Sequence, residues 1–226
     1  MRVAVVSGAS SGIGRAIALR LLKMGFSVIG ISRNDPSEFF KNEHFSHYKA
    51  DLSEEKDVLE CANFLKQKEV FLLINSAGFG RFEPHEELSA KTIMQMVFLN
   101  LSAPMLLANA TLKSLKKHEG YLININSIEA LRASKFAGVY SATKAGLKAF
   151  GDSLFEESRK SALSVTNINP DMTQSDFYNT LRFEPSKDSL LAEDIADAIE
   201  HILTMRKGAV VSEYTIRSLN FGIIKK

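Results

Sequence analysis

The sequence predicts a single α/β domain built on a doubly wound parallel sheet of about seven strands, with helices covering both faces. Short runs of β-branched and aliphatic residues alternate with longer stretches of helical periodicity along the chain, which is the pattern of parallel strands joined by helices. A length of 226 residues suits one such domain and is short for two. Hydrophobic residues make up 45% of the chain, enough for a buried core.

The first half of the chain carries the clearest alternation of strand and helix. After the first strand, Ile13, Ile17 and Leu21 recur at helical spacing until Gly25 offers a stop. Ser53 is a typical first residue of the next long helix, and Asp35-Pro36 suits the start of a short one. Strands are expected over residues 2–7, 27–32, 44–50 and 70–74.

The second half repeats the alternation with longer helices. Helices are expected over 88–117, where Pro104 is able to introduce a kink, and over 139–160 and 192–205. Residues 170–191 form a loop that is too long for a simple connection, a length typical of a lid. The remaining strands are expected over 121–126, 163–168 and 209–213.

Composition excludes several classes of function. The formal net charge of +2 is too small to predict a surface for nucleic acid or for an anionic membrane, so the expected partners are small molecules. Cys61 is the single cysteine, which excludes an intramolecular disulfide and favours a reducing, cytoplasmic location. The five histidines show no spacing typical of metal ligands, so no metal is predicted. Apolar runs of about ten residues or fewer, with no cleavage region near the start, predict neither a membrane span nor a signal peptide.

A glycine-rich turn, Ser7-Gly8-Ala9-Ser10-Ser11-Gly12-Ile13-Gly14, lies between the first strand and the first helix. Glycines there permit a tight turn and leave room for a pyrophosphate beside the N–H groups of the helix N-terminus. The turn is a weak signal alone, but the βα units that follow it supply the context of a Rossmann-type dinucleotide site.

The end of the second strand predicts which dinucleotide is preferred. NAD sites commonly place a carboxylate on the ribose 2′-hydroxyl, whereas a 2′-phosphate requires a cation. The sequence offers Ser32-Arg33-Asn34, with Arg15 as a possible second cation. We therefore expect NADP(H) to be preferred with Arg33 as its ligand, while the nearby Asp35 reduces this bias and leaves NAD(H) possible.

Tyr140 and Lys144 are four residues apart on an expected helix, so they share one face. A lysine cation beside the phenol, aided by an oxidised nicotinamide, is expected to lower the tyrosine pKa by roughly three units toward neutrality, so that Tyr140 transfers protons. Ser127, at the end of a strand, is placed to hold a substrate oxygen. Asn100, an unfavourable residue in mid-helix, is placed to anchor a water next to Lys144.

These motifs together resemble the short-chain dehydrogenase/reductase family over residues 1 to about 175. The resemblance implies a hydride transfer between nicotinamide and a carbonyl or alcohol, with Asn100, Ser127, Tyr140 and Lys144 as catalytic residues. It also implies that Lys144 holds the nicotinamide ribose and that Asp51 and Leu52 contact adenine. The full set of expected cofactor-binding residues is Gly8, Ser10, Ser11, Gly12, Ile13, Gly14, Arg33, Asp51, Leu52, Asn75, Ala77, Gly78, Tyr140, Lys144, Pro170 and Ser175.

The sequence departs from the family pattern on the nicotinamide side. Ser76 replaces the second asparagine of Asn-Asn-Ala-Gly, and Asp171 follows Pro170 where glycine is usual. Ser175 takes the place of the usual threonine, with Thr173 as an alternative hydroxyl. The family implies a homodimer or homotetramer, with the helices of residues 88–117 and 138–160 as the interface.

Mostly apolar residues are expected around the substrate, which favours an aliphatic or aromatic carbonyl compound. They come from three places: Phe79 and Phe82; residues 128–136; and Phe177, Tyr178 and Phe183. Glu129, Arg132 and Arg81 are polar exceptions, and either arginine is able to meet a carboxylate or phosphate. 

The sequence leaves three other functions to compare with this one. The runner-up is a 3-oxoacyl-thioester reductase, with Lys113, Lys116 and Lys117 as a dock for an acidic carrier protein. A non-enzymatic regulator that binds NADP is the third reading, which the full catalytic set disfavours. A serine hydrolase is disfavoured because Ser127 lacks the Gly-x-Ser-x-Gly elbow.

Overall fold

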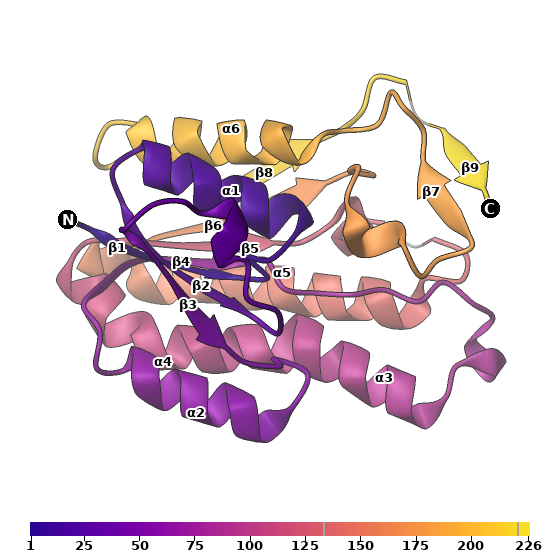
Figure 1. The fold of residues 1–226 in the computed structure, drawn as a ribbon, viewed down its shortest axis with the longest axis horizontal. Coiled ribbons are helices and arrows are strands. Elements are labelled where there is room, and N and C mark those ends of the chain that lie inside the picture. The colour runs from indigo at the N-terminus through magenta and orange to yellow at the C-terminus, as the bar shows by residue number, and fades with distance from the viewer. Residues whose placement is uncertain (133, 221) are drawn as a thin grey trace.

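The computed structural model describes residues 1–132, 134–220 and 222–226. Its central sheet has seven parallel strands in the order β3-β2-β1-β4-β5-β6-β8 (Figure 1). The order reverses between β1 and β4, where a crevice opens beyond the carboxyl ends of the strands. The strands are β1 Val3–Ser7, β2 Ser27–Ser32, β3 Phe45–Lys49, β4 Val70–Asn75, β5 Tyr121–Ile125, β6 Ser164–Pro170 and β8 Glu213–Ile216.

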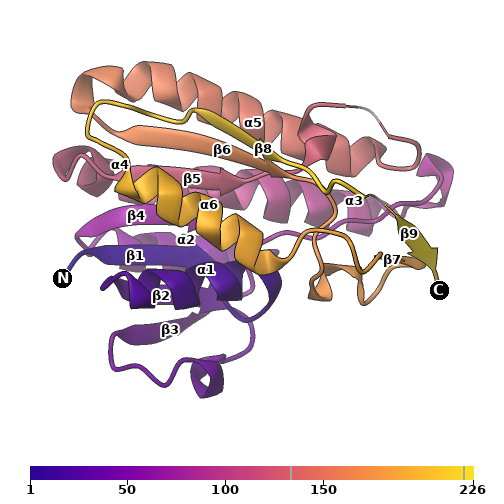
Figure 2. The same cartoon turned by 90° about the horizontal axis from the view of Figure 1, so that it is seen from above.

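Helices cover both faces of the sheet, so the predicted doubly wound architecture is confirmed. The helices α1 and α6 lie on one face, while α2 to α5 lie on the other (Figures 1 and 2). Each face encloses its own apolar layer against the strands. The helices are α1 Gly12–Lys23, α2 Glu55–Leu65, α3 Ala90–Val97, α4 Ala103–Lys117, α5 Gly138–Ser158 and α6 Ala192–Thr204.

The long helix expected over residues 88–117 is interrupted by a π-helical turn, Phe98–Ser102, between α3 and α4. Pro104 has no N–H, so it cannot donate the α-helical hydrogen bond to the carbonyl of Asn100. The irregularity expected at Pro104 therefore lies in the preceding turn, and Asn100 is part of it. Turns of this kind are frequent at functional sites.

Two strand predictions were wrong in detail. The last strand of the main sheet begins at Glu213 rather than at residue 209, because pairing with β6 starts only where Glu213 meets Asn167. The expected loop at 170–191 contains a further strand, β7 (Phe183–Pro185), which pairs antiparallel with β9 (Ile223–Lys225). Strands of three residues are too short to show an alternating pattern.

The helical run Ala90–Lys117 is long and apolar enough to span a bilayer by length and composition alone. This is weak evidence, because a core helix of a soluble protein meets the same criterion. In the structure, α4 packs against β4 and contributes Leu107 and Leu115 to the buried layer.

Candidate functional site

The glycine-rich turn at the end of β1 has the geometry needed to admit a phosphate group. Gly8 and Gly12 have φ of 72° and 50°, and a Cβ on Gly14 would lie 2.2 Å from the Gly8 carbonyl oxygen. The Ser11 side chain makes no capping hydrogen bond at the start of α1, and the first turn has no acidic residue. The N–H groups of this helix terminus are thus left for an anion.

A cleft of about 490 Å³ extends from this turn across the carboxyl ends of β1, β2 and β4. Its lining includes residues that the sequence did not indicate as part of the site, among them Ser53, Gln95 and Thr180. Of the expected cofactor-binding residues, Asn75, Tyr140, Lys144 and Pro170 lie outside the described lining. The expected residues that do line it are Gly8, Ser10, Ser11, Gly12, Ile13, Gly14, Arg33, Asp51, Leu52, Ala77, Gly78 and Ser175.

Asn75 is buried in β4, where it belongs to a row of asparagines that crosses three strands. It donates to Asn124 of β5 at 2.9 Å, and Asn124 donates to Asn167 of β6 at 3.2 Å. Asn167 in turn donates to Asp152 of α5 at 2.9 Å. The side chain of Asn75 therefore ties the strands together beneath the cleft. The adjacent turn is fixed by Ser7, whose hydroxyl accepts from the N–H groups of Ser76 and Ala77.

The turn that carries Arg33 is held in place by His47, a residue that the sequence did not single out. His47 Nε2 lies 3.1 Å from the hydroxyl of Ser32 and 3.0 Å from its carbonyl oxygen. Hydrogen bonds from Ser37 lower the pKa of Asp35, which follows Arg33 by two residues. The role of His47 follows only from the pairing of β3 with β2, which places His47 opposite Gly30, and the sequence alone does not show this pairing.

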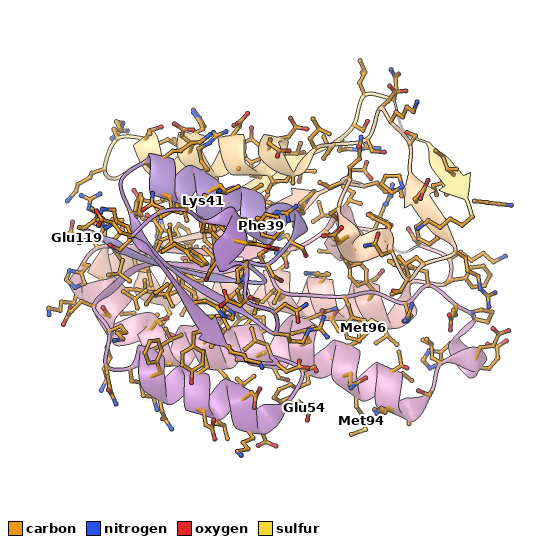
Figure 3. The ribbon with its side chains drawn as sticks, in the orientation of Figure 1. Phe39, Lys41, Glu54, Met94, Met96 and Glu119 are labelled. Carbon is orange, nitrogen blue, oxygen red and sulfur yellow. The ribbon has the colours of Figure 1, made fainter. Side chains whose placement is uncertain are left out.

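Arg15 is engaged outside the cleft. Its guanidinium carbon lies 4.7 Å from the centroid of the Phe39 ring, and Figure 3 shows Phe39 beside α1. The structure therefore gives Arg15 a stacking partner and leaves Arg33 as the cation that lines the cleft.

Tyr140 and Ser127 line a second cavity of about 650 Å³. Tyr140 comes from the first turn of α5 and Ser127 from the end of β5, where the Ser127 hydroxyl accepts from the N–H of Glu129 at 3.2 Å. Lys144, one turn further along α5, is buried and donates from Nζ to the Ile125 carbonyl at 2.8 Å. Its Nζ is 5.9 Å from the centre of the Tyr140 ring.

The side chain of Asn100 makes hydrogen bonds that the sequence did not predict. Its Oδ1 accepts from the N–H of Phe79 at 3.0 Å, and its Nδ2 donates to the Phe79 carbonyl and to Thr143. These bonds fix the loop after β4 against α5. Oδ1 keeps a second lone pair, so the water expected beside Lys144 stays a prediction. A Cβ on Gly78 would lie 3.1 Å from Asn100 Oδ1, which shows how closely this loop approaches.

Burial moves the two proton-carrying groups in opposite directions. It raises the pKa of the Tyr140 phenol to about 12, with the charge of Glu129 adding to the rise and a hydrogen bond with Ser127 opposing it. It lowers the pKa of the Lys144 ammonium to about 8. In the protein alone, burial therefore acts against the lowering that was expected from Lys144. The shift toward neutrality, which was expected with an oxidised nicotinamide bound, stays a prediction.

Aromatic rings form one side of the second cavity. The Phe82 ring centroid lies 5.2 Å from that of Tyr140 and 5.5 Å from that of Phe183, and Phe177 lies 5.8 Å from Tyr140. Of the expected pocket residues, Phe79 lines the first cleft instead. Those that line the second cavity are Phe82, Ile128, Glu129, Arg132, Ser134, Lys135, Phe136, Phe177, Tyr178 and Phe183; residue 133 lies outside the described residues.

The two cavities meet, because Ile13, Ser175 and Phe177 line both of them. Ser175 is therefore better placed at the junction than Thr173, whose hydroxyl donates to the carbonyl of Asp171 at 3.0 Å. Pro170 and Asp171 line the second cavity. The unusual Asp171 accepts from the N–H of Met172 at 3.0 Å and lies 3.6 Å from Arg217.

Arg81 and Arg132, the two arginines expected to meet a carboxylate or phosphate of the substrate, already have protein partners. Arg81 donates to the carbonyl of Thr180 at 2.8 Å and so ties the loop after β4 to the 171–191 segment. Arg132 lies 3.3 Å from the carboxylate of Glu129, which also accepts from Ser134. Within the described residues, no group of three or more histidine, cysteine or acidic side chains is gathered as a metal site would require.

Known proteins resemble this chain in sequence and in architecture. The sequence profile of the short chain dehydrogenases matches residues 2–185. An uncharacterized oxidoreductase of Staphylococcus epidermidis is 31% identical over 223 residues, which cover 96% of each chain. 

Solved structures resemble the chain over nearly its whole length. An alcohol dehydrogenase of the archaeon Thermococcus sibiricus, complexed with 5-hydroxy-NADP, is similar with a TM-score of 0.87 and 27% identity over 97% of each chain. A metagenomic short-chain oxidoreductase in complex with NADP has a TM-score of 0.82 and 26% identity, and the match covers 97% of this chain and 98% of the other.

Proposed function

This chain belongs to the short-chain dehydrogenase/reductase family, and from that premise we propose that it is an NADP(H)-dependent reductase of aldehydes or ketones. The observation that carries the proposal is the meeting of the two cavities. One has the anion-binding turn at its end, the other has Tyr140 and Ser127 in its wall, and Ile13, Ser175 and Phe177 are common to both. Such a junction is what a transfer between cofactor and substrate requires.

The residues support carbonyl reduction in particular. When bound, the nicotinamide supplies the hydride to the carbonyl carbon. With its pKa raised to about 12, the Tyr140 phenol stays protonated at neutral pH, which is the form that donates a proton to the carbonyl oxygen. Ser127 orients that oxygen by a hydrogen bond. Lys144 supplies positive charge nearby, which favours the phenolate left after proton transfer.

Replacement of Tyr140 by phenylalanine tests the catalytic assignment. NADPH oxidation, followed by nicotinamide absorbance with a panel of aldehydes, ketones, diketones and 3-oxoacyl thioesters, should fall by about 100-fold or more in Tyr140→Phe, because the proton donor is lost. Binding of NADPH should change little. Turnover that survives the substitution would contradict the assignment, and NADPH binding without turnover of any panel member would favour a regulatory protein.

NADP(H) is favoured over NAD(H) because Arg33 lines the cleft in a turn held by His47. NADP in two structural relatives above 25% identity supports a nicotinamide cofactor of this kind. Arg33→Asp should weaken NADPH binding by about 10- to 100-fold, through loss of a charge-assisted contact and gain of repulsion, and should affect NADH far less. Fluorescence titration of both cofactors measures the two affinities, and an equal loss for both would refute the role of Arg33.

A 3-oxoacyl-thioester reductase remains the second candidate, tested by the thioesters of the same panel. Its proposed basic dock is weakened by ion pairs, since Lys116 lies 3.1 Å from Glu157 and Lys117 lies 2.9 Å from Glu69. Good turnover of aldehydes with none of thioesters would remove this candidate. We further propose a cytoplasmic location and a homodimer or homotetramer.

A further inference from the structure

The strand β9 lies against the segment that covers the substrate cavity. It pairs with β7 in the register Phe183 to Lys225, Glu184 to Ile224 and Pro185 to Ile223. Figures 1 and 2 show this two-stranded ribbon beside the carboxyl ends of the main sheet, far from the N-terminus. Ile223 of this strand therefore reaches the cavity, although the last strand of the main sheet ends at Ile216.

Several further contacts fix this ribbon. The N–H of Lys226 donates to the Arg182 carbonyl at 2.9 Å, and the N–H of Ser186 donates to the Gly222 carbonyl at 3.0 Å. The Lys226 ammonium donates to the Tyr178 carbonyl at 3.0 Å and lies 3.4 Å from the Glu184 carboxylate. The β7 strand is thus held along its length from the C-terminal side.

The alternation of side chains in the ribbon separates two faces. Residues two apart on a strand, and residues paired across strands, share a face. Ile223 and Phe183 share the face that lines the 650 Å³ cavity. Ile224 pairs with Glu184 on the opposite face. The two isoleucines have similar exposure, 53% and 45%, yet only the first of them faces the cavity among the described lining residues.

We propose that β9 is the outer wall of the substrate cavity and that Ile223 is a specificity-determining residue, which limits the size of the apolar group on the carbonyl substrate. The inference rests on the proposed function and extends it. The inner side of the cavity, with Tyr140 and Phe82 in ring contact, is set by α5 and the loop after β4. Phe183 and Ile223 line the same cavity, and the Phe82 ring contacts both Phe183, at 5.5 Å between centroids, and Tyr140, at 5.2 Å. We expect a substrate whose carbonyl meets Tyr140 to extend its apolar substituent along these rings toward Ile223.

Substitution of the two neighbouring isoleucines separates the proposal from a general effect on folding. We would measure kcat/KM with NADPH for benzaldehyde and for 4-tert-butylbenzaldehyde. Ile223→Ala should shift the ratio toward the larger aldehyde by about tenfold, the scale of a change of a few methyl groups in an apolar pocket. Ile224→Ala removes the same atoms from the opposite face of the strand and should leave the ratio unchanged. Equal shifts in both variants, or none in Ile223→Ala, would overturn the proposal.

A second measurement does not depend on turnover. The sequence contains no tryptophan, so Ile223→Trp and Ile224→Trp each place a single indole on one face of the ribbon. Titration with 4-tert-butylbenzaldehyde, without NADPH, should change the emission of the first variant saturably and that of the second only weakly. Parallel responses in the two variants would contradict the assignment of the faces.

The outcomes distinguish this proposal from the proposed function. If Ile223→Trp responds saturably but the protein shows no NADPH oxidation with any carbonyl compound, the assignment of the cavity wall stands and the proposed reductase activity is refuted. Turnover of both aldehydes, with neither the ratio nor the emission sensitive to residue 223, would leave the reductase and remove the wall.

Discussion

Tyr140 and Lys144 show how the burial of single residues prepares a site for proton transfer. Both are buried in the first turns of α5. Burial shifts both groups toward their neutral forms, because desolvation penalises a charge of either sign, but with a pKa of about 8 the Lys144 ammonium still predominates at pH 7. The phenol consequently stays protonated at neutral pH and holds its proton more tightly than a solvated tyrosine does, while the ammonium titrates much closer to neutral pH than a solvated lysine does.

The buried lysine also predicts a dependence of stability on pH. The pKa of Lys144 is about 8 in the folded protein against an ordinary 10.5, so the unfolded chain binds more protons between these values. The free energy of unfolding should therefore rise as pH rises through this window, by on the order of 3 kcal/mol at ~1.4 kcal/mol per pH unit. Thermal melts at about pH 7.5 and about pH 9.5 should capture about 2 kcal/mol of this rise. Lys144→Met should be more stable than wild type at the lower pH, and its free energy of unfolding should show little of this rise with pH.

Sequence reasoning located residues whose chemistry depends on their own spacing or on a local turn. The glycine-rich turn, Arg33, Ser127 and Tyr140 all line the cavities as expected. It did not reach roles that depend on a partner distant in sequence. The hydrogen bonds from Asn100 to Phe79 and Thr143 have no local signal in the sequence. His47 and Ile223 contribute through strand pairing, which no local pattern displays.

At the scale of elements, α5 lies unusually close to β6 because Gly151 has no side chain. A Cβ there would lie 2.4 Å from Asn167 Oδ1 and 2.9 Å from Asn124 Nδ2, within the buried asparagine row. Helix and sheet are thus joined by a polar network rather than by apolar packing at this point. A close approach of this kind preserves the hydrogen bond from Asn167 to Asp152 on α5.

Gly151→Ala should destabilise the protein by about 1–3 kcal/mol, because the added methyl group has no space and displaces hydrogen-bonded amides. Gly138→Ala, in the first turn of the same helix, meets nothing within 4 Å and is the matched control. It should be neutral or stabilising by up to ~1 kcal/mol. Urea denaturation compares the two, and equal stabilities would show that the α5–β6 contact can open without cost.

The elements that the sequence predicted well are those buried on one or both sides. The strand β4 is buried at all six positions, and its apolar run was read with nearly correct bounds. In contrast, β8 alternates between exposed and half-buried residues. The apolar pair Val210-Val211 lies just before it, and the strand was therefore predicted several residues too early. Apolar content indicates strands dependably only where both faces of the sheet are covered.

At the scale of the whole molecule, the topology alone brings distant segments to one edge. Reversal of strand order between β1 and β4 opens the crevice in which the glycine turn, β4 and β5 end together. The sequence therefore sufficed for the fold class and for the edge that carries the site. It did not suffice for the substrate cavity, whose walls are completed by the ribbon of β7 and β9.

An apolar patch on α3 provides a test of the expected oligomer. Met94 is 69% exposed and points away from the molecule, whereas Met96 on the same helix is buried (Figure 3). If α3, α4 and α5 form the contact with a second copy, Met94→Glu should weaken association by tenfold or more, roughly the loss of one buried methionine. Leu59→Glu on α2, also exposed, is the control. Light scattering across a dilution series measures both, and a wild-type monomer would contradict the prediction.

The position of the β7–β9 ribbon also governs how the protein should be handled in the laboratory. Lys226 is held against Arg182 and Tyr178 at the edge of the substrate cavity, while Met1 is exposed at the far end of the sheet (Figure 1). An affinity tag fused behind Lys226 would emerge beside the cavity mouth and compete with these contacts. A tag placed before Met1 would leave the cavity undisturbed, so enzymatic assays belong with the amino-terminal fusion.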